Sequence, residues 1–163
     1  MQSPEQPSKV VQLSDELRRL CGASEHLIHA CAEEQGIYLT DFRALLLIRS
    51  AQHEDRTLTA GELAGALNLS SGAVTYLVER LTQSGHVIRQ VDPQDRRRVL
   101  LRGTERGLEV ADTFFQPMYD SLAPLSSQID DSQMIRLIGV LGQIHQNLNQ
   151  HAKQVRSNQG IAS

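Results

Sequence analysis

The sequence predicts a mainly α-helical fold with a small β-hairpin near its centre. Apolar residues recur at helical spacing through most of the 163 positions. Two segments rich in β-branched and apolar residues, 87–91 and 99–101, flank a turn composition and predict the hairpin. Two short helices joined by a tight turn are predicted directly before it. A chain of this length is expected to form one domain, with or without extensions.

The N-terminal part is predicted to be one long helix after a short disordered segment. Residues 1–8 are polar and contain two prolines. Apolar positions from Val10 to Cys31 then recur at helical spacing, and the pattern ends before Gly36. A helix is therefore expected over 9–35.

Two further helices are predicted before residue 70. Thr40 is expected to cap the first, and residues 51–57 to form a charged loop after it. Thr59 and Glu62 then form a capping box, in which each side chain accepts a hydrogen bond from the other residue's backbone amide. The apolar positions of these two helices are Phe42, Leu45, Leu46 and Ile48 in the first, and Leu63, Ala64 and Leu67 in the second.

The next helix is predicted to have one buried and one exposed face. Ser70 is a natural N-cap, and Ser84-Gly85 supplies a stop. The buried stripe at i, i+3, i+4 and i+7 consists of Val74, Leu77, Val78 and Leu81. The outward positions are Ser71, Gly72, Ala73, Thr75 and Tyr76. Small and hydroxyl-bearing residues let a helix approach base edges, and the helix N-terminus favours phosphates. Two amphipathic helices of an ordinary helical domain would show the same pattern.

The hairpin favours a nucleic-acid role for this helix pair. Residues 92–95 have a turn composition, and Arg96, Arg97 and Arg98 follow it. A solvated turn with incidental charge is the alternative. Three arginines on a hairpin directly after a helix-turn-helix are better explained by a wing that contacts phosphates or the narrow minor groove.

This central region resembles the winged helix-turn-helix of the MarR family of bacterial transcription regulators. The most specific match is the wing segment 92–97, followed by Thr104 and Gly107. The other matching positions are Leu63, Ala64, Leu67, Leu69, Ser70, Val74, Thr75, Val78, Glu79, Arg80, Leu81, Gly85, Val87 and Arg89. The resemblance implies that Asp95 orients Arg97 for insertion into the minor groove. Tyr76 stands where an arginine is common in the family, and Gly103 stands where an apolar residue is usual.

The C-terminal part is predicted to form two helices with a break over 124–130. Thr104 is expected to cap the first, and Pro117 to kink it. The second is expected to start at Asp130 or Asp131, and residues 153–163 to form a disordered tail. The apolar positions are Leu108, Ala111, Phe115, Met118 and Leu122 in the first helix, and Met134, Leu137, Ile138, Leu141, Ile144 and Leu148 in the second.

These terminal helices bear on assembly. In a monomer, 9–35 and 108–152 would pack on one another; in a homodimer they would interlock with a partner's copies. Winged-helix regulators usually bind two half-sites, which favours the dimer, and the resemblance implies the same. The predicted architecture is thus a winged helix-turn-helix over 40–107 with a β-hairpin wing, flanked by N- and C-terminal dimerisation helices.

Charge is distributed unevenly along the chain. The formal net charge is −3, but residues 68–106 hold seven arginines and four acidic residues, a local charge of +3. The rest of the chain carries −6. A basic patch on an acidic body steers DNA towards one face.

Other classes of function have little support. There is no apolar run of membrane-spanning length and no signal-peptide pattern, so a cytoplasmic protein is expected. Neither a phosphate-binding glycine loop nor a catalytic motif occurs, so neither an enzyme nor a cofactor is expected. Cys21 and Cys31 are about 15 Å apart on one helix, too far for a disulfide. Cys21 falls on the apolar stripe and is expected to be buried.

A metal site is also weakly supported. Glu25 and His29 are helical neighbours close to His26 and Cys31, but polar residues on a solvated or dimer-facing stripe explain them better, so no metal is predicted.

The expected function is a DNA-binding transcription regulator, acting as a repressor on a pseudo-palindromic operator, with release by a small-molecule effector. Two alternatives stay open: a winged-helix protein-interaction module, and a metal- or oxidant-sensing regulator of the same fold. The expected DNA contacts are Ser70, Ser71, Gly72, Ala73, Thr75, Tyr76, Arg80, Asp95, Arg96, Arg97 and Arg98. The expected effector site, between the dimer helices and the winged region, is lined by His26, His29, Arg43, and Phe114 or Phe115.

Overall fold

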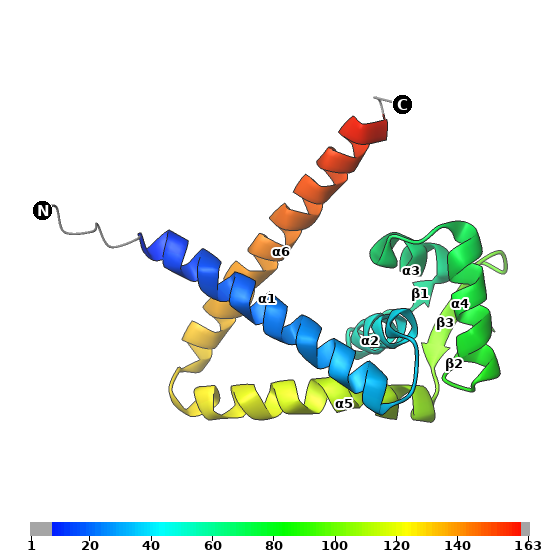
Figure 1. The fold of residues 1–163 in the computed structure, drawn as a ribbon, viewed down its shortest axis with the longest axis horizontal. Coiled ribbons are helices and arrows are strands. Elements are labelled where there is room, and N and C mark those ends of the chain that lie inside the picture. Colours follow the sequence, from blue (N-terminus) through cyan, green and yellow to red (C-terminus); the bar gives the residue numbers. More distant parts are fainter. Residues whose placement is uncertain (1–7, 161–163) are drawn as a thin grey trace, which may run out of the picture. The chain divides into compact units, whose positions relative to one another are not determined.

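The computed structural model describes residues 8–160, with side chains described to residue 155. It divides into two compact units, with the boundary between Pro117 and Met118. The elements of the first unit, in chain order, are α1 (Lys9–Glu34), α2 (Leu39–His53), β1 (Leu58–Thr59), α3 (Ala60–Leu67), α4 (Ser71–Gln83), β2 (Val87–Val91), β3 (Val99–Gly103) and most of α5 (Glu105–Leu122) (Figure 1). The second unit holds the end of α5, the 3₁₀ helix η1 (Ala123–Ser127) and α6 (Asp131–Gly160).

The predicted hairpin is confirmed, and the sheet has a third strand. β2 pairs antiparallel with β3, with Val87 opposite Gly103 and Val91 opposite Val99. β1 pairs with the other edge of β3, giving the order β1-β3-β2. The sequence did not indicate β1, because a two-residue strand is too short to show an alternating pattern.

The caps of the helix-turn-helix form as predicted. The Thr59 hydroxyl accepts from the Glu62 amide at 3.2 Å, and the Glu62 carboxylate accepts from the Thr59 amide at 2.7 Å. These bonds hold the pKa of Glu62 below its ordinary value. The Ser70 hydroxyl accepts from the Ala73 amide at 3.3 Å. Between the helices, Asn68 adopts the left-handed conformation, which ends α3 and starts the turn.

The core of the first unit lies where α2, α3, α4 and the sheet meet. All four predicted apolar positions of α4 are buried. The largest fully buried side chains of the described residues are Phe42, Leu45, Ile48, Leu63, Leu81, Leu101, Val78 and Val87. Because both helices of the helix-turn-helix and both hairpin strands contribute to it, this core fixes the wing relative to α4.

Several predicted boundaries are wrong. α2 follows Tyr38 rather than a Thr40 cap, because the Tyr38 carbonyl accepts from the amides of Asp41 and Phe42. α2 also runs to His53, so the loop after it is shorter than predicted. α6 continues to Gly160, and residues 153–160 are helix rather than a disordered tail. Apolar periodicity stops in that stretch, but some of its residues, such as Lys153 and Gln154, have a high helix propensity.

The N-terminus of α1 differs from the prediction in two details. Ser8, placed in the disordered segment, caps α1 by accepting from the Val11 amide at 3.3 Å, whereas residues 1–7 and 161–163 lie outside the described range. Cys21 is exposed, not buried. Among the described residues of α1, only Ile28, Cys31 and Ala32 are buried, because α1 extends beyond the helices it packs on (Figure 1).

The start of α5 passes very close to the corner between α4 and β2. The Thr104 amide donates to the His86 carbonyl at 3.0 Å, and the Thr104 hydroxyl donates to the Gly85 carbonyl at 2.7 Å. A Cβ atom at Gly107 would lie 2.0 Å from the His86 carbonyl oxygen. Only glycine at this position permits such an approach of two backbones.

We therefore expect Gly107→Ala to lower the free energy of unfolding by at least about 1–3 kcal/mol, the usual cost of overpacking. Denaturant unfolding followed by circular dichroism measures this. Gly65→Ala is the matched control, because nothing lies within 4 Å of its added Cβ and alanine favours the helix. A Gly107→Ala protein as stable as Gly65→Ala would contradict the close approach.

Candidate nucleic-acid interface

Helix α4 has one buried face and one exposed face. Its apolar stripe packs inward, and all five predicted outward positions are exposed, namely Ser71, Gly72, Ala73, Thr75 and Tyr76. The Thr75 hydroxyl donates to the Ser71 carbonyl at 2.8 Å, which fixes the hydroxyl and leaves its oxygen able to accept a further hydrogen bond. The exposed face therefore combines small residues, one oriented hydroxyl and the ring of Tyr76.

Arg80, one of the predicted DNA contacts, differs from these residues. Its guanidinium donates to both oxygens of the Asp41 carboxylate, at 2.6 and 2.5 Å. It also lies over the rings of Tyr38 and Tyr76. Arg80 thus connects α4 to the start of α2 rather than extending freely from the surface.

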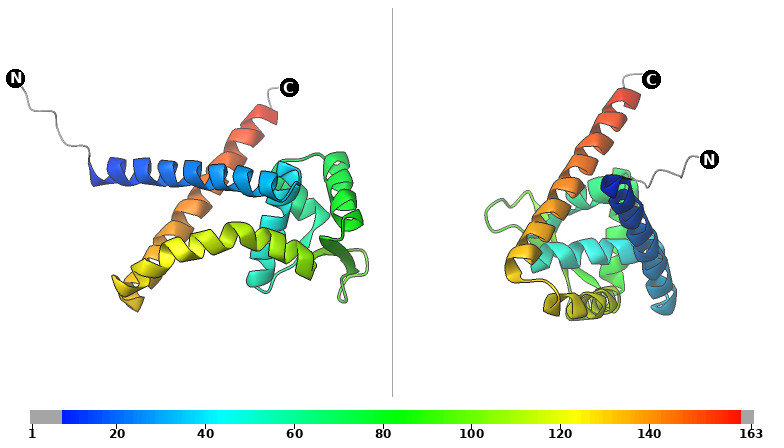
Figure 2. Two further views of the ribbon diagram at one scale, coloured as in Figure 1. Left: turned by 60° about the horizontal axis from the view of Figure 1, so that its bottom comes forward. Right: turned by 90° about the vertical axis from the view of Figure 1, so that its left-hand side faces the viewer.

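The β2–β3 turn is organised by two aspartates and projects from the first unit (Figure 2). The Asp92 carboxylate accepts from the Gln94 amide at 2.8 Å, and the Asp95 carboxylate accepts from the Arg97 amide at 3.0 Å. The Asp92 amide donates to the Arg98 carbonyl at 3.0 Å and closes the turn. The contact of Asp95 with Arg97 is thus made to the backbone amide of Arg97 and not to its guanidinium.

The three turn arginines have different surroundings. The Arg98 guanidinium is 3.9 Å from the Glu62 carboxylate and 4.0 Å from that of Asp92, so it leans towards α3. The guanidinium groups of Arg96 and Arg97 form no ion pair or hydrogen bond with any described residue, and both residues are exposed. Two unpaired positive charges on a projecting turn are suited to contact phosphates or a narrow groove.

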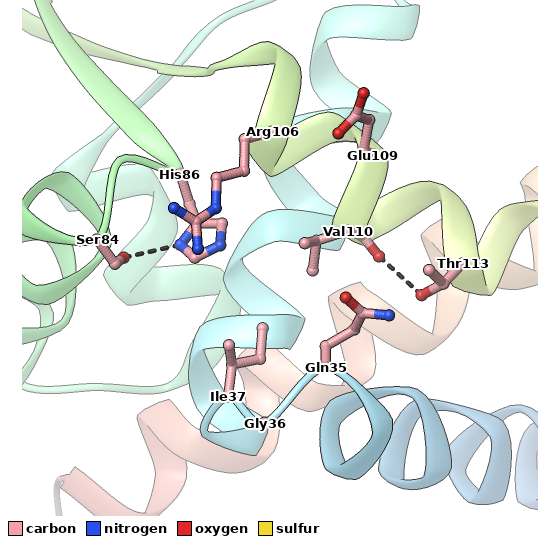
Figure 3. A pocket seen from close by; sticks show the side chains of 9 residues that line it. All are labelled: Gln35, Gly36, Ile37, Ser84, His86, Arg106, Glu109, Val110 and Thr113. Atoms are coloured by element: carbon pink, nitrogen blue, oxygen red, sulfur yellow. Dashed lines mark hydrogen bonds between the residues drawn. The ribbon is translucent and has the colours of Figure 1, made fainter.

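A separate cavity of about 600 Å³ lies within the first unit (Figure 3). Its walls come from the segment after α1, the corner between α4 and β2, and α5. It is lined by Gln35, Gly36, Ile37, Ser84, His86, Arg106, Glu109, Val110 and Thr113. The buried His86 ring holds the Ser84 hydroxyl at 2.7 Å through Nδ1. Burial lowers the pKa of His86, and the nearby Arg106 charge lowers it further.

The polar groups of this cavity include one cation without a partner. The Arg106 side chain extends towards His86, whereas the Glu109 carboxylate points away from both (Figure 3). Within the described part of the chain, the Arg106 guanidinium has no ion pair or hydrogen bond. Sequence spacing carries little signal for this group, because Gln35, His86 and Arg106 come from three separate segments.

The residues predicted to line an effector site lie in different surroundings. His26 and His29 are exposed on α1, and Arg43 pairs with Glu25 beside a smaller cavity of about 240 Å³. The Phe115 ring packs edge-on against Phe114, with ring centroids 5.3 Å apart, and under Arg49. Neither of these two cavities brings the four predicted residues together.

Features of two other classes of protein are missing from the described chain. Between residues 8 and 160, no group of three or more His, Cys, Asp or Glu side chains could hold a metal ion. No helix in the same range has the length and apolarity needed to cross a membrane.

Comparison with known proteins agrees with the fold. Residues 35–98 match the family model described as MarR family. The chain is 30% identical over 136 residues to YcgE of Bacillus subtilis, an HTH-type transcriptional regulator, covering 83% of this chain and 86% of YcgE. It is 28% identical over 116 residues to the transcriptional repressor MprA of Escherichia coli, covering 71% and 65% of the two chains.

Solved structures of MepR from S. aureus have a similar fold. A mutant MepR from a multidrug resistant clinical isolate has a TM-score of 0.68 at 20% identity, covering 88% of this chain and 99% of that one. A second MepR mutant, bound to an oligodeoxyribonucleotide, and MepR bound to ethidium bromide each have a TM-score of 0.53 at 21% identity. Each covers 83% of this chain, against 97% and 95% of the respective MepR chains.

The buried His86 makes stability depend on pH. Its lowered pKa means that the unfolded chain binds a proton more tightly than the folded chain does, so the free energy of unfolding falls as pH decreases below the ordinary histidine value of 6.5. We expect this loss to set in as the pH falls through about 6.5, and we expect His86→Gln to reduce the slope. Urea unfolding at several pH values measures it. His29→Gln, at an exposed site, should keep the wild-type slope; equal slopes in all three proteins would contradict the assignment.

Proposed function

Because the chain belongs to the MarR family of winged helix-turn-helix transcription regulators, we propose that it binds a pseudo-palindromic operator as a homodimer and represses transcription until a small molecule releases it. The exposed face of α4 enters the major groove, and the β2–β3 turn enters the adjacent minor groove. The exposed α4 residues, with Asp95, Arg96, Arg97 and Arg98, form the contact surface.

One observation carries the DNA-binding part of this proposal. Arg96 and Arg97 are unpaired on a projecting turn, and the same buried core that holds this turn also holds α4. A solvated turn would not need two adjacent unpaired cations that repel one another. Phosphates on both sides of a minor groove relieve that repulsion.

The homodimer is supported by apolar surface that a single chain leaves exposed. Val10, Leu13 and Leu20 of α1 are at least half exposed. In the second unit no described residue is buried, and its exposed large apolar residues are Tyr119, Leu122, Leu125, Ile135, Leu137, Ile138, Val140, Leu141, Leu148 and Val155. Apolar surface on this scale marks an interface. A two-fold dimer would present its two α4 helices to half-sites about one DNA turn apart.

Repression is supported by the relative MprA, which is named a repressor. A dimer that covers about two turns of duplex excludes other proteins from that DNA, so an operator at a promoter gives repression without a further contact.

Selection from a random DNA pool tests the core of the proposal. The selected sites should contain two inverted half-sites about 10 bp apart, centre to centre, and binding should weaken steeply as salt increases. A winged-helix module that binds only proteins would enrich no sequence.

The effector site is proposed at the cavity lined by Gln35, His86 and Arg106. Arg106 offers an unpaired guanidinium, His86 a neutral ring, and Ile37 and Val110 apolar wall. This combination suits a small organic acid, whose carboxylate can bond to the guanidinium in a bidentate way. The cavity includes Ser84, directly after α4, so a ligand with a higher affinity for a displaced α4 would reduce the DNA-bound population.

For the wing, we expect Arg97→Ala to weaken binding to the selected operator and to an unrelated duplex by a similar factor. The contact is with groove shape and phosphate, so its loss also reduces the salt dependence by about one charge. Fluorescence anisotropy at several salt concentrations measures both effects. Arg18→Ala removes the same charge from exposed α1 and should leave both affinities unchanged. Wild-type affinity in Arg97→Ala at moderate salt would contradict the wing assignment.

For the cavity, operator release is titrated with benzoate and 4-hydroxyphenylacetate as probes. We expect at least one to release the wild-type protein, and Arg106→Met to raise the half-release concentration about tenfold or more, because a charge-assisted hydrogen bond is lost. Arg43→Met, at the smaller cavity, is the matched control and should respond like the wild type. If Arg43→Met raised the half-release concentration and Arg106→Met did not, the effector would instead bind near Arg43.

A further inference from the structure

Four side chains form one cluster where the start of α2 meets the exposed side of α4. Tyr38 and Asp41 belong to the first turn of α2 and its cap, and Tyr76 and Arg80 are one turn apart on α4. The centre of the Arg80 guanidinium is 4.4 Å from the Tyr38 ring centroid and 5.0 Å from that of Tyr76. We call these residues the Arg80 cluster.

The Asp41–Arg80 pair anchors this cluster. The Asp41 side chain is 4% exposed, and the Arg80 side chain is 27% exposed. Two parallel hydrogen bonds fix the plane of the guanidinium as well as its position. Hydrogen bonding to Asp41, with a smaller contribution from Tyr76, raises the pKa of Arg80 above its ordinary value, so the cation is permanent.

The same pair argues against Arg80 as a DNA contact. A guanidinium that swings out to reach a base or a phosphate would leave the buried Asp41 charge without a partner, which is strongly unfavourable. Its two hydrogen bonds to the carboxylate would also have to break. Arg80 is therefore committed to the protein, and its effect on DNA has to pass through the residues it touches.

The two tyrosines are the exposed part of the cluster. Tyr38 and Tyr76 are each 66% exposed, an unusual degree for large aromatic side chains. A cation that lies over both rings restricts their side-chain rotation while leaving their outer parts open. A side chain held in its bound conformation loses less entropy on binding and so binds more selectively.

We propose that Arg80 is a positioning residue that fixes Tyr76, the specificity-determining residue of α4, with Tyr38 as the second ring that holds the guanidinium in place. This proposal rests on the proposed function, because it assigns Tyr76 to base recognition on the exposed face of α4. It also changes the predicted role of Arg80 from a DNA contact to an internal support. Base selection then depends on a residue pair that never touches the DNA.

The test separates support from simple stabilisation. The double substitution Asp41→Leu with Arg80→Met replaces the pair with apolar side chains and leaves no stranded buried charge, so the fold should be kept. The ratio of affinities for the selected operator and for an unrelated duplex is measured in the wild type, the double variant, Tyr76→Ala and the triple variant. We expect the ratio to fall about tenfold in the double variant, with affinity for the unrelated duplex nearly unchanged.

The decisive result is the coupling between the pair and Tyr76. If the pair acts through Tyr76, then adding Tyr76→Ala to the double variant lowers the ratio little further. An ordinary stabilising pair would give additive losses, and additive losses overturn the proposal. A ratio that stays at the wild-type value in the double variant also overturns it.

If the double variant does not fold, the affinity ratio is measured in Arg80→Lys instead. Lysine keeps the charge beside Asp41 but not the planar fork or the stacking surface. We expect a smaller fall in the ratio than in the double variant, and an unchanged ratio counts against the proposal.

Arg49→Met is the matched control. Arg49 is also paired with an aspartate, Asp112, at 2.9 Å, and lies 5.8 Å from the centroid of Phe115, with a side chain 21% exposed. It should alter stability without altering the affinity ratio, and a fall equal to that of the double variant would overturn the proposal. If the wild type selects no site at all, the proposed function itself fails, and this inference fails with it.

Discussion

The winged region depends on one constraint, the burial of a single face of α4. Four side chains, Val74, Leu77, Val78 and Leu81, are each at most 3% exposed. At about 1.5–3 kcal/mol each, their burial contributes on the order of 6–12 kcal/mol, comparable with the net stability of a whole domain. Because this face has to face the core, the opposite face is directed outward, and no separate interaction is needed to present it.

Polar groups then set the precise geometry that apolar packing leaves undefined. The capping box on α3, the Ser70 cap on α4 and the aspartates of the β2–β3 turn each fix a backbone segment through hydrogen bonds within three residues. The Arg80 cluster does the same across a sequence separation of 39 residues. Among the described residues, no buried side-chain nitrogen or oxygen atom lacks a partner. The first unit is thus held by local bonds at each corner and by a long-range ion pair beside the exposed face of α4.

The sequence predicted the features that depend on local interactions. Helical periodicity identified the α4 stripe, and residue types at fixed spacing identified the capping box and the arginine turn. It did not predict β1, whose two residues are a strand only because β3 lies beside them. The Asp41–Arg80 pair and the group formed by Gln35, His86 and Arg106 likewise join distant segments, and spacing carries no signal for such contacts. Cys21 was misplaced for the converse reason, because helical periodicity shows which face is apolar but not whether anything covers it.

The described part of the second unit has no buried face of this kind. Its described residues include many large apolar side chains and none that is buried, so the burial that stabilises α4 is missing for α6 within one chain. In the proposed homodimer a second copy supplies it, and the free energy of folding then depends on protomer concentration by mass action. Dimer formation and operator binding would be linked, since two α4 helices at a fixed separation exist only in the dimer. The winged region is stabilised by its own core, whereas in the proposed homodimer the spacing of its two copies would be set by helices that association stabilises.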